Sequence, residues 1–127
     1  MALLPDMVGI VVSDVPRSVA FYRLLGLAFP DPERQDFVEV KTPNGYRISL
    51  NSESMMKSID PERIKPQGQR LELAIKCDSP KHVDETYAAI TKAGHKGHKE
   101  PWDAFWGQRY AIVVDPDGVH ISLFAAL

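Results

Sequence analysis

Several features common in other protein classes are missing from this sequence. Its single cysteine, Cys77, excludes a disulfide within the chain. No apolar run approaches the roughly 18 residues of a membrane span, and the first residues lack the basic and then apolar stretches of a secretory signal. A net charge of −2 gives no electrostatic reason to expect nucleic acid or an anionic membrane as a partner. These absences predict a cytoplasmic protein that binds neither.

The chain does have the size and composition of a single globular domain. Its 127 residues, 44% of them apolar, are enough to bury a hydrophobic core. Cys77 ends an apolar stretch, which favours a buried and inert thiol over a catalytic nucleophile.

One short pattern occurs twice. Residues 42–50 and 115–123 share Pro, Gly, Ile, Ser and Leu in the same order, with Gly45 and Gly118 lying 73 positions apart. Proline and glycine favour a tight turn, and the apolar residues that follow alternate with polar ones as in a strand. Both copies therefore predict a turn that leads into a strand.

A second repeat supports the first. Asp14 and Asp78 each end a strand-like run, and each is followed two residues later by proline and five residues later by valine. Aspartate is a good helix N-cap, proline suits the first helical turn, and Gly26 and Gly94 can end the two helices. The chain is thus predicted to contain two copies of a strand, a helix and further strands.

The predicted elements follow from these signals. In the first copy they are a strand at 7–13, a helix from Asp14 to Gly26, a short strand at 27–29, and strands at 37–40 and 46–50. In the second copy they are a strand at 71–77, a helix at about 80–93, and strands near 96–100, 108–114 and 119–125. Residues 51–69 form a polar linker in which a short helix is possible around 54–59.

The sequence resembles the vicinal oxygen chelate, or glyoxalase/bleomycin-resistance/dioxygenase, superfamily. The segments that carry the resemblance are residues 8–14, 17–22, 25–27, 106–110, 115–118 and 121–123. It implies an α+β fold in which two βαβββ modules form curved mixed sheets around a cleft, with the helices outside. It also implies one domain over 1–127, with module one at about 5–51, a linker at about 52–69 and module two at about 70–127. Related two-module proteins are usually homodimers, so we expect a homodimer.

Enzymes of this family usually hold a divalent ion, and the resemblance places its ligands at Met7, Ser49, Glu72 and Ser122. A thioether and two neutral hydroxyls are poor ligands for such ions, so only Glu72 is suitable. A shift of register would put Leu71 in its place. We therefore predict neither a metal ion nor another cofactor.

The remaining candidates indicate recognition of a small molecule. Aromatic side chains gather at Trp102, Phe105 and Trp106, where related antibiotic-binding proteins stack planar ligands. Tyr46, Arg47 and Arg109 are expected to bring donors or a cation to the rim of the cleft, as is Tyr110. His120 shares a strand face with Ser122, whereas His98 falls in a polar stretch expected to be solvated. The predicted ligand-binding residues are Met7, Tyr46, Arg47, Ser49, Glu72, Trp102, Phe105, Trp106, Arg109, His120 and Ser122.

Two functions remain open. The first is a metal-independent small-molecule binding protein of the bleomycin-resistance type, holding a planar or aromatic ligand in the cleft. The second is a lyase, isomerase or dioxygenase of the superfamily with an atypical or absent metal site. In that case Glu72 is the candidate catalytic residue, acting as a general base.

Overall fold

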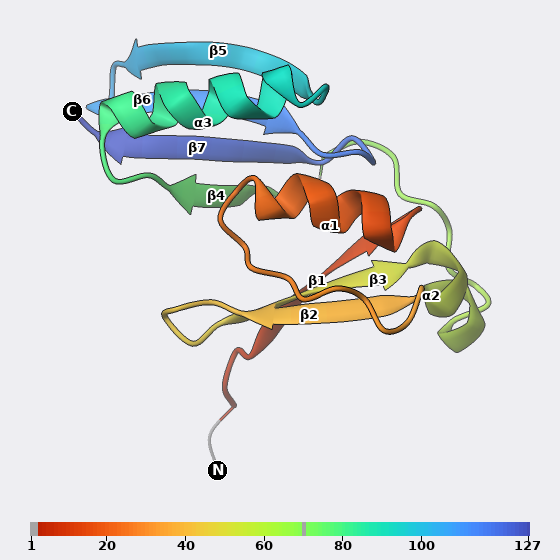
Figure 1. Ribbon diagram of the computed structural model, residues 1–127. Coiled ribbons are helices and arrows are strands. Elements are labelled where there is room, and N and C mark those ends of the chain that lie inside the picture. The colour runs from red at the N-terminus through yellow and green to blue at the C-terminus, as the bar shows by residue number, and fades with distance from the viewer. Residues whose placement is uncertain (1–2, 70) are drawn as a thin grey trace. The chain divides into compact units, whose positions relative to one another are not determined.

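The computed structural model describes residues 3–69 and 71–127. The chain divides into two compact units, Met1–Pro66 and Gln67–Leu127. Figure 1 labels the helices and strands of both. Within the described residues, no helix combines the length and the hydropathy that crossing a bilayer requires.

The first unit contains a three-stranded mixed sheet and two helices. Its elements are β1 (Met7–Val12), α1 (Val15–Arg23), β2 (Phe37–Lys41), β3 (Arg47–Ser52) and α2 (Glu53–Ile59). The strand order is β1-β3-β2, in which β1 runs parallel and β2 antiparallel to β3. The parallel pair brings together the first and last strands of the unit, and α1 lies in the connection between them.

The sequence signals for α1 are confirmed. The side chain of Asp14 accepts a hydrogen bond from the backbone N–H of Arg17 at 3.0 Å, and proline lies in the first turn. Gly26 adopts a φ of 81°, a left-handed conformation that ends the chain's helical path. The short helix predicted in the linker is also present, as α2, with Ser52 as its N-cap.

The predicted strand at 27–29 is wrong, so the first unit has three strands instead of four. The backbone N–H of Leu27 donates to Tyr22 and that of Phe29 donates to Leu27, which leaves neither for a sheet. The carbonyl of Phe29 accepts from Arg23 Nε at 3.0 Å. Leu27 and Phe29 are nevertheless buried, so the apolar signal reflected core packing and not a strand.

The second unit has the complete βαβββ order. Its elements are β4 (Leu73–Lys76), α3 (Pro80–Lys92), β5 (Lys96–Ala104), β6 (Gln108–Val114) and β7 (His120–Ala126). The strand order is β4-β7-β6-β5, in which β4 runs parallel to β7 and the other pairs are antiparallel. Figure 1 shows α3 lying along one face of this sheet. Val83 and Ile90 of α3, with Ile121 and Leu123 of β7, are completely buried.

The two repeated turns share the same hydrogen bonds. In the first unit, the N–H of Gly45 donates to the carbonyl of Thr42, and Thr42 Oγ1 accepts from the N–H of Tyr46. In the second, the N–H of Gly118 donates to the carbonyl of Asp115, whose Oδ1 accepts from the N–H of Val119. Gly45 and Gly118 have φ of 88° and 91°. The repeat seen in the sequence is therefore a repeat of hydrogen bonding.

Two strands of the second unit differ in length from the prediction. The strand expected at 71–77 is confined to β4, because Leu71 and Glu72 are exposed and precede the pairing with β7. The strand expected near 96–100 extends to Ala104 as β5. It passes through Pro101 with shifts of register, and a proline is tolerated there because β5 is an edge strand.

Candidate ligand-binding site

The sheet of the second unit has one face covered by α3 and an opposite face, here called the helix-free face. Side chains alternate between the two along each strand. Ile121 and Leu123 of β7 point toward α3, so His120, Ser122 and Phe124 point to the helix-free face. The pairing of Phe124 with Tyr110, and of Tyr110 with Trp102, continues this face across β6 and β5.

Three aromatic rings meet on the helix-free face. Trp102 lies on β5, Tyr110 lies on β6, and Trp106 lies in the hairpin loop between them. The ring centroids are 5.4 Å apart for Trp102 and Tyr110, 5.3 Å for Trp106 and Tyr110, and 6.0 Å for the two tryptophans. All three contacts are edge-to-face, the geometry that aromatic quadrupoles favour. We call these three residues the aromatic cluster.

The hairpin loop exposes two of the predicted aromatic residues. Phe105 is 98% exposed and Trp106 is 48% exposed, with their centroids 5.1 Å apart. Gly107 closes the loop with a φ of 89°, and its N–H donates to the carbonyl of Ala104. The indole N–H of Trp106 donates to Gln108 Oε1 at 2.8 Å. The ring of Trp106 is thus held in place while about half of its surface is free for another molecule.

A cation lies against the same cluster. Lys99 Nζ is 4.5 Å from the centroid of the Trp102 ring, which is a cation–π contact. Lys99 pairs with Ile112 of β6, two positions from Tyr110 on the same face. One end of the aromatic cluster is therefore positively charged.

Two imidazoles stack at the other end of this face. The rings of His98 and His120 have centroids 4.4 Å apart and are tilted by 33°. The backbone N–H of His120 donates to Gln69 Oε1, and Gln69 Nε2 donates to the carbonyl of Gly118. Glu72 is exposed and directly precedes Leu73, the residue of β4 that pairs with Ile121.

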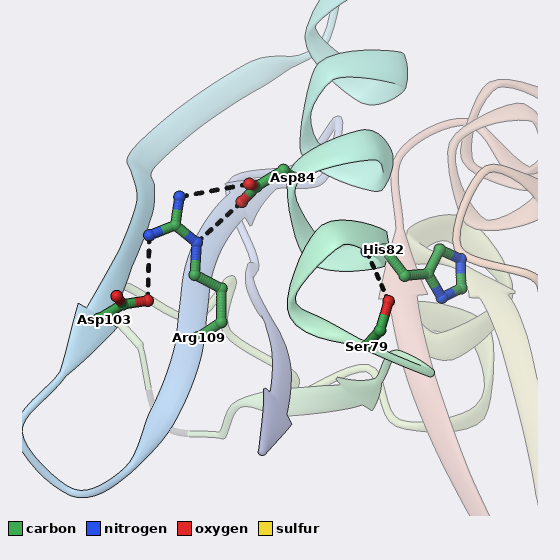
Figure 2. A network of polar contacts seen from close by, with 5 residues as sticks. All are labelled: Ser79, His82, Asp84, Asp103 and Arg109. Atoms are coloured by element: carbon green, nitrogen blue, oxygen red, sulfur yellow. Dashed lines mark hydrogen bonds and ion pairs between the residues drawn. The ribbon is translucent and has the colours of Figure 1, made fainter. Parts of the chain in front are cut away.

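Arg109 lies on the other side of the sheet from the aromatic cluster. Figure 2 shows its guanidinium between Asp84 of α3 and Asp103 of β5. Nε donates to Asp84 Oδ1 at 2.9 Å, Nη2 to Asp84 Oδ2 at 3.3 Å, and Nη1 to Asp103 Oδ1 at 3.2 Å. The hydrogen bond to Asp84 is the main cause that raises the pKa of Arg109. Arg109 therefore joins α3 to the sheet, and its side chain lies on the opposite face from that of Tyr110.

Figure 2 also shows the start of α3. The hydroxyl of Ser79 caps the helix by accepting from the backbone N–H of His82 at 3.2 Å. His82 Nδ1 accepts from the backbone N–H of Asp78 at 3.0 Å. His82 therefore contributes to the hydrogen bonding at the N-terminus of α3.

Three candidates of the first unit, Met7, Arg47 and Ser49, share one face of its sheet, because Met7 pairs with Arg47 and Ser49 lies two residues further along β3. Arg47 Nη1 donates to Glu39 Oε2 at 2.6 Å, and Nη2 contacts Asp6. The hydrogen bond that Arg47 donates to Asp6 is the largest of the causes that raise the pKa of Arg47. Ser49 is fully buried and donates to Asn51 Oδ1 at 2.7 Å, whereas Met7 is 39% exposed at the start of β1. Tyr46 is half-buried beside the turn. Arg47 is thus already neutralised by two carboxylates.

The comparisons with known proteins agree with this fold. A sequence profile of the glyoxalase/bleomycin resistance protein/dioxygenase superfamily matches residues 4–123. The chain belongs to this superfamily. No curated protein matches the sequence significantly.

Solved structures of other proteins share the fold at low sequence identity. A glyoxalase/bleomycin resistance protein/dioxygenase family enzyme from Burkholderia phytofirmans PsJN has a TM-score of 0.84 and 20% identity, covering 96% of this chain and 98% of its own. A hypothetical protein from S. aureus has a TM-score of 0.82 and 19% identity, covering 99% and 95%. A protein from Agrobacterium tumefaciens has a TM-score of 0.78 and 26% identity, covering 99% of both chains.

The superfamily's usual divalent ion does not suit the residues at the corresponding positions. The neutral hydroxyl of Ser49 donates a hydrogen bond to Asn51, and the side chain of Met7 has only a soft thioether as a ligand. Ser122 is buried to 1% exposure and carries no charge. Across residues 3–69 and 71–127, no three His, Cys, Asp or Glu side chains are grouped so that they could hold a metal ion. The donor set therefore does not fit the superfamily's ion.

Several residues of the helix-free face were absent from the predicted binding set, among them His98, Lys99 and Phe124, and also Tyr110, which was expected only at the rim. Tyr110 and Phe124 alternate in phase with the predicted Ser122, so strand periodicity was a usable signal for both. Lys99 and His98 had no such signal. They belong to the part of β5 where the register shifts, and simple alternation fails there.

Proposed function

We propose that this protein is a metal-independent small-molecule binding protein, and that it holds a planar or aromatic ligand against Trp102, Trp106 and Tyr110. The observation that carries the proposal is the exposure of Trp106 within an otherwise well-packed aromatic cluster. Its indole is fixed by Gln108, so a ligand would meet a surface that is already ordered. Apolar area with few polar groups is typical of small-molecule sites.

Tryptophan fluorescence tests this proposal directly. The sequence has only two tryptophans, and both belong to the aromatic cluster. Titration with planar aromatic compounds should therefore give saturable quenching. Trp106→Ala should weaken binding about tenfold, with Trp102 as the remaining reporter. Tyr87→Phe is the matched control, because Tyr87 lies on α3 on the other side of the sheet. Unchanged affinity in both Trp106→Ala and Trp102→Ala would exclude the cluster as the site.

An enzyme of the superfamily is the second candidate. It is supported by the pairing of Leu73 with Ile121, because Glu72 and His120 directly precede these two residues, and a carboxylate and an imidazole at neighbouring strand starts could exchange protons with a ligand. Turnover of a bound compound, lost in Glu72→Gln with binding retained, would establish it. Stoichiometric nickel, zinc, iron or manganese in the purified protein would also favour the enzyme.

We also propose that the protein is a cytoplasmic homodimer, by analogy with two-module relatives. Light scattering coupled to gel filtration at micromolar concentration measures the mass. A monomeric mass would contradict the dimer.

A further inference from the structure

The helix-free face carries positive charge as well as aromatic rings. Lys76 pairs with Phe124, Lys99 with Ile112, and Lys96 with Val114, so all three ammonium groups belong to this face. Residues directly opposite each other on paired strands project to the same side of the sheet. His98 and His120 lie on this face too.

These lysines differ in their surroundings from Lys81 and Arg109 of the same unit. In the described part of the chain, none of Lys76, Lys96 and Lys99 forms an ion pair with a carboxylate, whereas Arg109 has two partners and Lys81 pairs with Glu85. The carboxylates of Asp84 and Asp103 are engaged by Arg109 on the covered face. The lysines of the helix-free face therefore keep their charge available to an anion.

The acidic residues close to this face are few. Glu100 follows Lys99 in the chain but acts on Tyr87 of α3, whose pKa is raised by burial and then by this carboxylate. Glu72 precedes β4, which lies at the far edge of the sheet from Lys99. The charge next to the aromatic cluster is therefore positive.

Lys99 links the charge to the rings. Its ammonium group lies 4.5 Å from the Trp102 centroid, so the side chain is already directed toward the aromatic cluster. Positions two residues apart on one strand are about 7 Å apart, which is comparable with the length of a fused two-ring system. A flat molecule resting on Trp106 and Tyr110 would thus bring a substituent at its end near Lys99.

We propose that the ligand is an aromatic anion, with its rings against the aromatic cluster and its acid group paired with Lys99. The inference rests on the proposed function and adds the charge of the ligand to it. An ammonium group paired with a carboxylate, sulfonate or phosphate forms a charge-assisted hydrogen bond, which is stronger than a neutral one. A neutral ring of the same shape would lack this bond and bind less tightly.

Calorimetric titration with matched probes tests the charge. The probes are β-naphthoate and β-naphthamide, together with the carboxylate and carboxamide of anthracene, which differ in charge but hardly in shape. We expect each carboxylate to bind about tenfold more tightly than its amide at low salt, and less so at high salt. Lys99→Gln should remove the preference without changing amide binding, and Lys99→Arg should keep it. Lys92→Gln is the control, because it removes the same charge from the end of α3.

The outcomes separate the two proposals. Equal binding of carboxylate and amide overturns the aromatic anion and leaves the planar ligand standing. A preference that survives Lys99→Gln overturns the assignment of Lys99. No binding of any of the four probes overturns both proposals.

Discussion

Gly97 of β5 lies directly beneath the ring of Tyr87 of α3. A Cβ at position 97 would be 2.5 Å from Tyr87 Cζ and closer still to its hydroxyl oxygen. Gly97→Ala should therefore force the ring away from the sheet and lower the free energy of unfolding by about 1–3 kcal/mol, as overpacking does. Urea unfolding followed by far-ultraviolet circular dichroism measures the change.

A double-mutant cycle with Tyr87→Ala checks the cause. If the ring is the obstacle, Gly97→Ala should cost much less when Tyr87 is already alanine. An equal cost in both backgrounds would point to the backbone of β5 instead.

The turn before β7 depends on one buried carboxylate. Asp115 is 4% exposed, and its Oδ1 accepts from the N–H groups of Asp117 at 2.9 Å and Val119 at 2.8 Å. Asp115→Ala should leave both donors without this acceptor and destabilise the protein by about 1–3 kcal/mol in urea unfolding.

The first unit supplies the control for this turn. Thr42 occupies the corresponding position and accepts from Tyr46 at 3.1 Å. Asp115→Thr should therefore recover part of the stability that Asp115→Ala loses. Equal loss in the two variants would show that the side-chain hydrogen bond to Val119 is unimportant.

Much of the fold could be predicted because its signals are local. Gly45 and Gly118 each adopt a positive φ, which other residues rarely adopt. Asp14 caps the start of α1, and Gly26 follows its end within the same short segment. The strand at 27–29 was wrong because burial of Leu27 and Phe29 looks the same in a sequence whether or not their backbone joins a sheet.

The site was harder to predict because it depends on which side of a sheet each residue faces. Arg109 and Tyr110 are neighbours in the chain, yet one binds Asp84 on the covered face and the other contacts Trp102 on the helix-free face. The approach of Lys99 to Trp102 arises where the register of β5 shifts, and no short pattern in the sequence announces such a shift.

Removal of metal should have no effect on stability or binding. Ser49 and Ser122 stand where the superfamily implies charged or imidazole ligands, and Ser49 is already bonded to Asn51. Dialysis against a chelator should leave the unfolding midpoint and the tryptophan quenching unchanged. Calorimetric titration with zinc or nickel should show no stoichiometric binding. A bound ion that is lost in Ser122→Ala or Glu72→Gln would contradict this prediction.

Cys77 should make the protein less stable at alkaline pH. The thiol is 3% exposed, and burial raises its pKa despite a hydrogen bond with Thr86. In the unfolded chain the pKa of the thiol is about 8.5. Above that pH the unfolded chain loses a proton that the folded chain retains, so unfolding becomes more favourable. The neutral thiol makes its full contribution to the free energy of unfolding at pH values below its pKa in the unfolded chain. This contribution is lost as the pH rises through its pKa in the folded protein.

Urea unfolding from about pH 7 to 10 measures this loss, with Cys77→Ala as the reference that lacks the titrating group. The wild-type protein should lose more stability over this range than the variant, because all other titratable groups are the same in the two proteins. The native thiol should also react slowly with a disulfide reagent at pH near 8, since little thiolate is present and the sulfur is covered. Parallel pH profiles together with rapid labelling would mean that Cys77 is exposed and titrates normally.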